Sequence, residues 1–112
     1  MSTALERLAA TIASRRNDDA GTSYTRSLLD GGPARCAKKF GEEAVETVIA
    51  ALGEDDAHLT SEAADTLYHL LVLLASRDIA LNDVMAELDR RAGVSGHAEK
   101  AARGQTTSGP AS

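Results

Sequence analysis

The sequence contains few aromatic residues, which make up 3% of its 112 positions, and it has no tryptophan. A hydrophobic core must therefore come from Leu, Val, Ile and Ala, a composition that favours helices. The only cysteine is Cys36, which excludes an internal disulfide and disfavours a cysteine-based zinc site within one chain. The longest apolar stretch, Leu70 to Ala75, is far too short to cross a bilayer, and no signal peptide is visible. We therefore expect a cytoplasmic protein with no membrane partner.

Positive charge is also scarce, because 12 basic residues stand against 17 acidic ones and the net charge is −5 at pH 7. This balance argues against nucleic acid as the partner. The remaining composition, with 43% apolar and 26% charged residues, is ordinary for a globular chain of one domain. We expect a single all-α domain over residues 1–103, followed by a disordered polar tail over residues 104–112.

The apolar pattern predicts about five helices and no strand. The first four are expected from a capping box at Thr3 to about Arg16, from Ser23 to Asp30, from Pro33 to about Leu52, and from a cap at Thr60 or Ser61 to about Arg77. Residues 54–59 are expected to form a connecting loop. A fifth helix is expected from a cap at Asn82 to about Gly93, with a further short helix over residues 95–103.

Two pairs of carboxylates are the most informative feature of the chain. Glu43 and Glu46 are three residues apart on the third expected helix, and Glu62 and Asp65 are three apart on the fourth. Residues i and i+3 share a helix face, so two antiparallel helices would point all four carboxylates at one place. Such carboxylates repel one another unless a cation lies between them. Oxygen ligands favour Mg2+, with Mn2+ as the alternative, so these four residues are the predicted metal ligands.

Lysines precede the acids by one helical turn. Lys38 and Lys39 could supply positive charge for substrate phosphates, which Mg2+ held by carboxylates commonly also binds. They could equally form simple ion pairs with Glu42 and Glu43 at i+4. The sequence has no Walker loop, dinucleotide turn or nucleophile elbow, so water is the expected nucleophile.

Helical phasing separates these charges from the apolar residues. On the third helix the acids and Lys39 share a face away from the apolar stripe, and His69 follows the acids on the fourth helix. Beyond its first two turns the fourth helix is apolar all round and must be buried on every side. In so small a chain this predicts a symmetric homodimer.

Each carboxylate pair also has a simpler interpretation. An isolated Glu-x-x-Glu is usually a solvated helix face, and Glu62 and Asp65 could merely favour a helix N-terminus. The occurrence of two such pairs on consecutive helices is what favours a metal site over these alternatives.

The same residues carry a family resemblance. Glu43-x-x-Glu46 followed by Glu62-x-x-Asp65 resembles the signature of the MazG-like superfamily of all-α nucleotide pyrophosphohydrolases. Within it the chain is similar to the phosphoribosyl-ATP pyrophosphatase family, over nearly its whole length to about residue 103. The most specific segments are Ser23-Tyr24-Thr25 and residues 38–46 and 64–74. Phe40, residues 32–34 and the polar tail are less typical.

The resemblance implies a MazG-like helical bundle completed by dimerisation. It implies Mg2+-dependent hydrolysis of the α–β phosphoanhydride of phosphoribosyl-ATP to phosphoribosyl-AMP and pyrophosphate, the second step of histidine biosynthesis. Glu42 is then a further ligand or the base that orients water, and Lys39, together with Lys38, contacts the triphosphate. Tyr24 and Thr25 are expected substrate contacts.

Two alternatives stay open from the sequence. The first is a housekeeping MazG-like pyrophosphohydrolase that acts on non-canonical or deoxynucleoside triphosphates. The second is a non-enzymatic helical dimer whose acids only decorate its surface.

Overall fold

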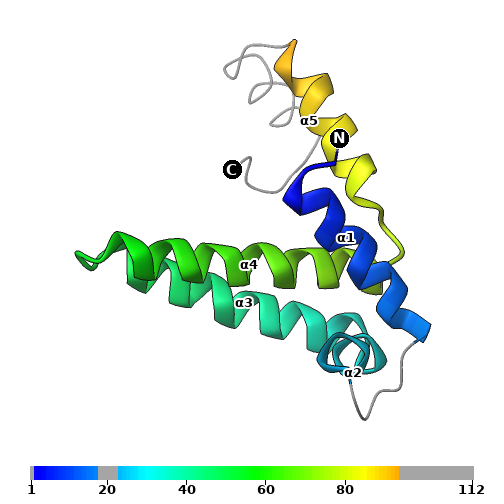
Figure 1. Cartoon of the computed structure of the whole chain (residues 1–112), viewed down its shortest axis with the longest axis horizontal. Helices are drawn as coiled ribbons and strands as arrows, with labels where there is room; N and C mark the ends of the chain where they lie inside the picture. The colour runs from blue at the N-terminus through cyan, green and yellow to red at the C-terminus, as the bar shows by residue number, and fades with distance from the viewer. Residues whose placement is uncertain (1, 18–22, 94–112) are drawn as a thin grey trace, which may run out of the picture. The chain divides into compact units, whose positions relative to one another are not determined.

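The computed structural model describes residues 2–17 and 23–93 of the chain. Over these residues the protein is all-α, as predicted (Figure 1). Its helices are α1 (Ala4–Ser14), a 3₁₀ turn (Arg15–Asn17), α2 (Tyr24–Asp30), α3 (Gly32–Ala51), α4 (Asp56–Ser76) and α5 (Leu81–Ala92). None of the helices in this described part has the length and hydropathy that a membrane span requires. The helix expected over residues 95–103 and the tail over 104–112 lie outside the described residues.

The chain divides into two compact units, residues 1–81 and 82–112. The second unit contains all but the first residue of α5. Within α5, Arg90 and Arg91 donate to the Glu87 carboxylate at 2.7 and 2.9 Å. These hydrogen bonds, that from Arg90 first, lower the pKa of Glu87 to about 2. The pairing supports the helix at i+3 and i+4 spacing.

Side-chain caps set the helix starts in the first unit. The predicted capping box is present, because Thr3 Oγ1 accepts from the Glu6 amide at 3.1 Å and Glu6 accepts from the Thr3 amide at 2.9 Å. Ser23, as predicted, caps α2 by accepting from the Arg26 amide.

The predicted start of the fourth helix is wrong by five or six residues, because the cap is Asp55 and not Thr60 or Ser61. Asp55 is the cap of α4, since its carboxylate accepts from the amides of Ala57 and His58 at 3.0 and 3.4 Å. The segment expected to be a loop is therefore largely helical, and the Thr60 hydroxyl donates to the Asp56 carbonyl inside the helix. A carboxylate at this position accepts hydrogen bonds from the first amides and interacts favourably with the positive end of the helix dipole. The helix therefore begins directly after Asp55.

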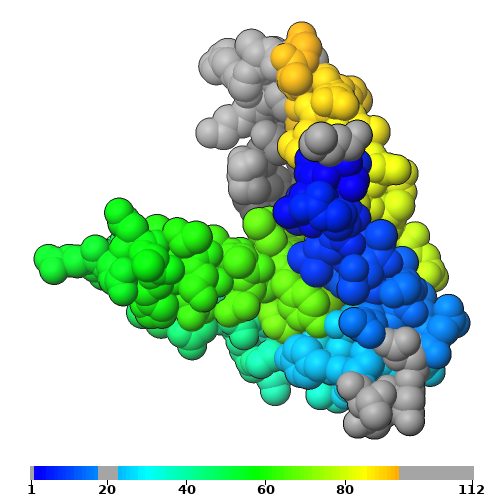
Figure 2. Space-filling model, in the orientation of Figure 1, coloured from blue at the N-terminus to red at the C-terminus, as the bar shows by residue number. Residues whose placement is uncertain are grey.

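The core of the first unit lies where α1 and α2 pack against the hairpin formed by α3 and α4 (Figure 1). Its buried members come from all four helices: Ile12, Leu28, Cys36, Leu71 and Val72. α3 and α4 run antiparallel along most of their length. The turn between them, at residues 52–55, lies at the end of the hairpin that α1 and α2 do not cover (Figure 2).

The helix α3 does not bury its widest apolar stripe. The side toward α4 carries small and polar residues, among them Cys36, Glu43 and Thr47. Four large apolar side chains further along the helix are instead 58–84% exposed, and we call them the exposed α3 stripe: Val45, Val48, Ile49 and Leu52. The sequence predicted that the acids and the apolar residues lie on different faces of α3. In the structure Glu43, and not the exposed stripe, lies toward α4, whereas Glu42 and Glu46 are exposed.

Candidate functional site

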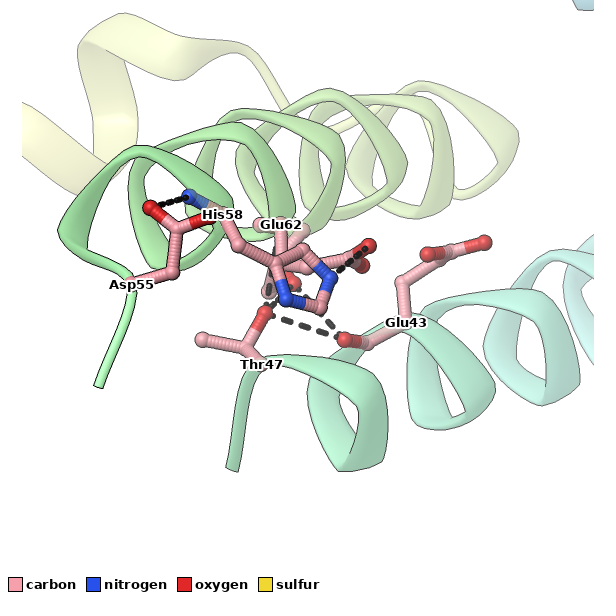
Figure 3. Close-up of polar contacts among 6 residues, drawn as sticks. Glu43, Thr47, Asp55, His58 and Glu62 are labelled. Atoms are coloured by element: carbon pink, nitrogen blue, oxygen red, sulfur yellow. Dashed lines mark hydrogen bonds and ion pairs between the residues drawn. The ribbon is translucent and has the colours of Figure 1, made fainter. Parts of the chain in front are cut away.

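Three carboxylates from two helices converge at the middle of the α3–α4 hairpin. Glu43 on α3 and Glu62 and Asp65 on α4 can place one oxygen each within 4.8 Å of one another, and we call them the acidic cluster. Glu43 and Glu62 have side chains only 19% exposed, whereas Asp65 is exposed. Figure 3 shows Glu43 and Glu62 extending toward the same space between the helices. Three of the four predicted metal ligands are therefore brought together.

The other two acids of α3 lie outside this cluster. Glu46 is exposed one turn after Glu43, and the structure does not bring it into the group of three. Glu42 is also exposed, and its carboxylate lies 3.6 Å from Lys39 Nζ.

The cluster has only weak compensation from its neighbours. Lys39 Nζ is 3.8 Å from the Glu43 carboxylate, and His58 Nε2 is 3.4 Å from that of Glu62 (Figure 3). Both ion pairs are accessible to solvent, and such pairs contribute little to stability. Three clustered carboxylates offer only oxygen donors, which is the donor set that a hard divalent cation such as Mg2+ prefers.

Sequence reasoning missed His58, although its i+4 spacing to Glu62 was visible.

A basic pocket of about 280 Å3 adjoins the cluster on α3, and its walls are Arg35, Lys38, Lys39 and Glu42. Within the described part of the chain, Arg35 and Lys38 form no ion pair or hydrogen bond. Their charges are therefore available to an anion. Sequence reasoning found both lysines but missed Arg35, which lies one turn before Lys38 and Lys39 and could have been found by its spacing.

Gly31 makes room for the Arg35 side chain. A Cβ at position 31 would lie 2.3 Å from Arg35 Cδ and 3.0 Å from Arg35 Cβ. The backbone of Gly31 has an ordinary helical φ of −73°, so any residue could adopt its conformation. Space for the arginine, and not backbone freedom, is thus what this glycine provides.

A small aromatic cluster lies where α2 meets α4. The His69 ring is 5% exposed and meets the rings of Tyr68 and Tyr24 edge-on, with centroids 4.9 and 6.2 Å apart. Burial lowers the pKa of His69, and the carboxylate charges of Glu43 and Asp65 oppose this shift only in part. The ring is therefore neutral at pH 7.

The two predicted substrate contacts of α2 differ in access. Tyr24 is 54% exposed, whereas Thr25 is 9% exposed and its hydroxyl hydrogen-bonds the Tyr68 hydroxyl. Burial raises the pKa of Tyr68, so this hydroxyl keeps its proton.

Two threonine hydroxyls meet between the helices directly behind the cluster. Thr47 Oγ1 and Thr66 Oγ1 are 2.6 Å apart. Thr47 Oγ1 is 3.0 Å from the carbonyl oxygens of Glu43 and Glu62 (Figure 3). Thr66 Oγ1 is 3.0 Å from the carbonyl oxygen of Glu43. The hydroxyls thus contact the backbone of two residues of the acidic cluster.

Fold and site together define a class of protein, an all-α chain whose helical hairpin carries an oxygen-ligand cluster beside a basic pocket. The family model for phosphoribosyl-ATP pyrophosphohydrolase matches residues 5–92. The chain therefore belongs to the phosphoribosyl-ATP pyrophosphohydrolase family.

Individual relatives agree with this assignment. The phosphoribosyl-ATP pyrophosphatase of Rhodobacter capsulatus is 62% identical over 102 residues, which cover 91% of this chain and 99% of the relative. That of Paracoccus denitrificans is 62% identical over 101 residues, covering 90% and 94%. That of Ruegeria pomeroyi is 59% identical over 99 residues, covering 88% and 94%.

Proposed function

We propose that this chain hydrolyses phosphoribosyl-ATP to phosphoribosyl-AMP and pyrophosphate with the help of Mg2+, as a cytoplasmic enzyme of histidine biosynthesis. The observation that carries the proposal is the acidic cluster beside a pocket with two unpaired cations, in a member of this family. A divalent cation and basic side chains are together what a triphosphate requires for binding.

Glu43, Glu62 and Asp65 would hold the ion, and Glu46 is proposed as a further ligand because it follows Glu43 on the same helical side. When bound, Mg2+ neutralises phosphate charge and makes the phosphorus more open to attack.

The chain's own residues would bind and orient the reactants. Arg35, Lys38 and Lys39 hold the phosphates, and Lys39 also stabilises the negative charge that develops on the leaving pyrophosphate. The Glu42 carboxylate accepts a proton from the attacking water as the P–O bond of the α–β anhydride breaks. Tyr24 offers an exposed ring to the nucleoside. Thr25 bonds the Tyr68 hydroxyl, and the rings of Tyr68 and Tyr24 both contact His69, so Thr25 is proposed to help to hold this side of the substrate site.

A homodimer is part of this proposal. The exposed α3 stripe is a group of large apolar side chains in the uncovered half of the hairpin, and a soluble monomer rarely leaves such a group in water. A second copy packed on this stripe would bury it and complete the bundle around the hairpin.

The decisive test removes one charge from the cluster without changing its shape. Glu62→Gln and Asp65→Asn should each lower pyrophosphate release from phosphoribosyl-ATP by at least about 100-fold, the scale on which a lost charge-stabilising group lowers turnover. Calorimetry should show loss of Mg2+ binding in both variants, while circular dichroism shows wild-type helix content.

Glu54→Gln is the matched control, because Glu54 is an exposed acid in the turn between the same two helices. It should leave both readouts unchanged. Near-wild-type turnover of Asp65→Asn at saturating Mg2+ would refute the assigned site, and preference for ordinary nucleoside triphosphates over phosphoribosyl-ATP would refute the substrate.

A further inference from the structure

We infer that Thr47 and Thr66 are positioning residues for the cation site, which rests on the proposed function. Each threonine follows a residue of the acidic cluster by four positions, Thr47 after Glu43 and Thr66 after Glu62. Residues four apart share a helix face, so each hydroxyl lies one turn behind a carboxylate, on the side where α3 and α4 meet.

Counting the protons of the two hydroxyls shows which acceptors they can bond at one time. Two hydroxyls have two protons, and four short contacts compete for them. The 2.6 Å separation of the two hydroxyl oxygens requires a proton between them, which leaves one for a carbonyl. Either Thr47 donates to Thr66 and Thr66 donates to the Glu43 carbonyl, or Thr66 donates to Thr47 and Thr47 donates to a carbonyl of Glu43 or Glu62. In the first arrangement, and in the second when the carbonyl is that of Glu62, the chain of bonds crosses between the helices twice.

A purely stabilising role does not explain the pair. Both hydroxyls are partly buried, and a buried pair of hydrogen-bonding groups gains little over apolar groups of the same shape. Valine has nearly the shape of threonine and would pack at both positions. What valine cannot do is tie α3 to α4 by a hydrogen bond to the backbone of residue 43 or residue 62, which sets the spacing of the two helices here.

That spacing matters because the carboxylates on these residues repel one another before the cation binds. The repulsion acts to spread α3 from α4 at this point, and the hydroxyl pair opposes it through backbone atoms. The ligands are then held near their binding positions in advance, which lowers the ordering cost of binding Mg2+.

The test is the double variant Thr47→Val/Thr66→Val. Groups that orient metal ligands typically change metal affinity by about 10- to 100-fold when removed, so we expect Mg2+ binding about 10-fold weaker by calorimetry. The Mg2+ concentration for half-maximal turnover should rise by a similar factor, whereas turnover at saturating Mg2+ should stay within about threefold, because the bound ion then holds the carboxylates itself. Helix content should be unchanged.

Two further variants make the result specific. Thr47→Ser/Thr66→Ser keeps both hydroxyls and should keep the wild-type Mg2+ affinity. Thr11→Val removes a hydroxyl that makes the same i−4 bond, to the Arg7 carbonyl at 3.0 Å, but no contact between helices, and it should have no effect on Mg2+. If the double valine variant does not fold, the single variant Thr66→Val takes its place, with the same direction expected.

The outcomes separate the two proposals. Wild-type Mg2+ affinity in the valine variants, or a loss in the serine variant equal to theirs, overturns the positioning role. Failure of the wild-type protein to bind Mg2+ or to release pyrophosphate overturns the proposed function instead. An equal fall in turnover at every Mg2+ concentration, with affinity unchanged, also counts against positioning.

Discussion

At the scale of single residues, one of the unpaired cations of the basic pocket, Arg35, depends on a neighbour that has no side chain. Gly31 leaves the space that the stem of Arg35 occupies, so Gly31→Ala should displace Arg35 without adding or removing a charge. We expect Gly31→Ala and Arg35→Ala each to raise KM for phosphoribosyl-ATP about fivefold, as expected for one exposed charge contact worth about 1 kcal/mol, with kcat within about twofold. Steady-state kinetics would measure both.

Gly41→Ala is the control, since it lies on the same helix and, apart from its chain neighbours and the backbone of its own helix, a Cβ there meets no atom within 4 Å. It should leave KM unchanged. A wild-type KM in Arg35→Ala would remove Arg35 from the phosphate site.

Residues that act through their own charge were easiest to predict from the sequence. The convergence of Glu43, Glu62 and Asp65 could be expected because i+3 spacing on two packed helices places like charges on one face, but the same spacing included Glu46, which lies outside the cluster. Thr47 and Thr66 could not be predicted, because a threonine in a helix has no distinctive chemistry until its partner on another helix is known. Tertiary contacts, and not local pattern, define such residues.

At the scale of elements, the end of α4 contains the only non-glycine residue with a positive φ in the described part of the chain. Asp78 has φ of 58° and closes a Schellman motif, in which the amides of Asp78 and Ile79 bond the carbonyls of Ala75 and Leu74. Its carboxylate also lies 3.0 Å from Arg16, which donates to the Ala75 carbonyl. Arg16 thus helps close α4.

Asp78→Gly should raise stability, because the left-handed conformation costs an L-residue about 1–2 kcal/mol and the exposed ion pair returns less than about 1 kcal/mol. The expected net gain of up to about 1 kcal/mol corresponds to a rise in Tm of a few degrees, measured by thermal unfolding followed by circular dichroism.

Asp78→Asn separates the two effects, because asparagine tolerates the same conformation but lacks the charge. A glycine variant that melts below the asparagine variant would show that the contact with Arg16 outweighs the backbone strain.

Helix types and most boundaries followed from the sequence, whereas the start of α4 did not. Thr60 and Ser61 are residue types that commonly cap helices, and they led to a predicted start five or six residues too late. The polar residues from 55 to 58 join the helix because Asp55 satisfies the first amides, and capping does not require an apolar stripe.

At the scale of the whole molecule, the exposed α3 stripe is the main evidence for association. In a symmetric dimer packed on this stripe, Ile49→Glu would bury one unpaired charge from each copy in an apolar interface. We expect this variant to sediment as a monomer at concentrations where the wild-type chain is a dimer.

Ala10→Glu adds the same charge at an exposed position of α1 and should leave the sedimentation unchanged. A wild-type chain that is monomeric at all concentrations would refute the dimer. The exposed α3 stripe would then have to be buried against a different partner.

The placement of the acidic cluster on one hairpin has a consequence for the order in which the protein assembles. Glu43 and Asp65 are 22 residues apart (65 − 43), so the chain closes a short loop to bring them together, at a small entropic cost. Like charges therefore meet when the hairpin first forms, before α1 and α2 need to cover it. We therefore expect mutual repulsion of these carboxylates to slow the earliest pairing of α3 and α4, and dissolved salt, by screening that repulsion, to speed it.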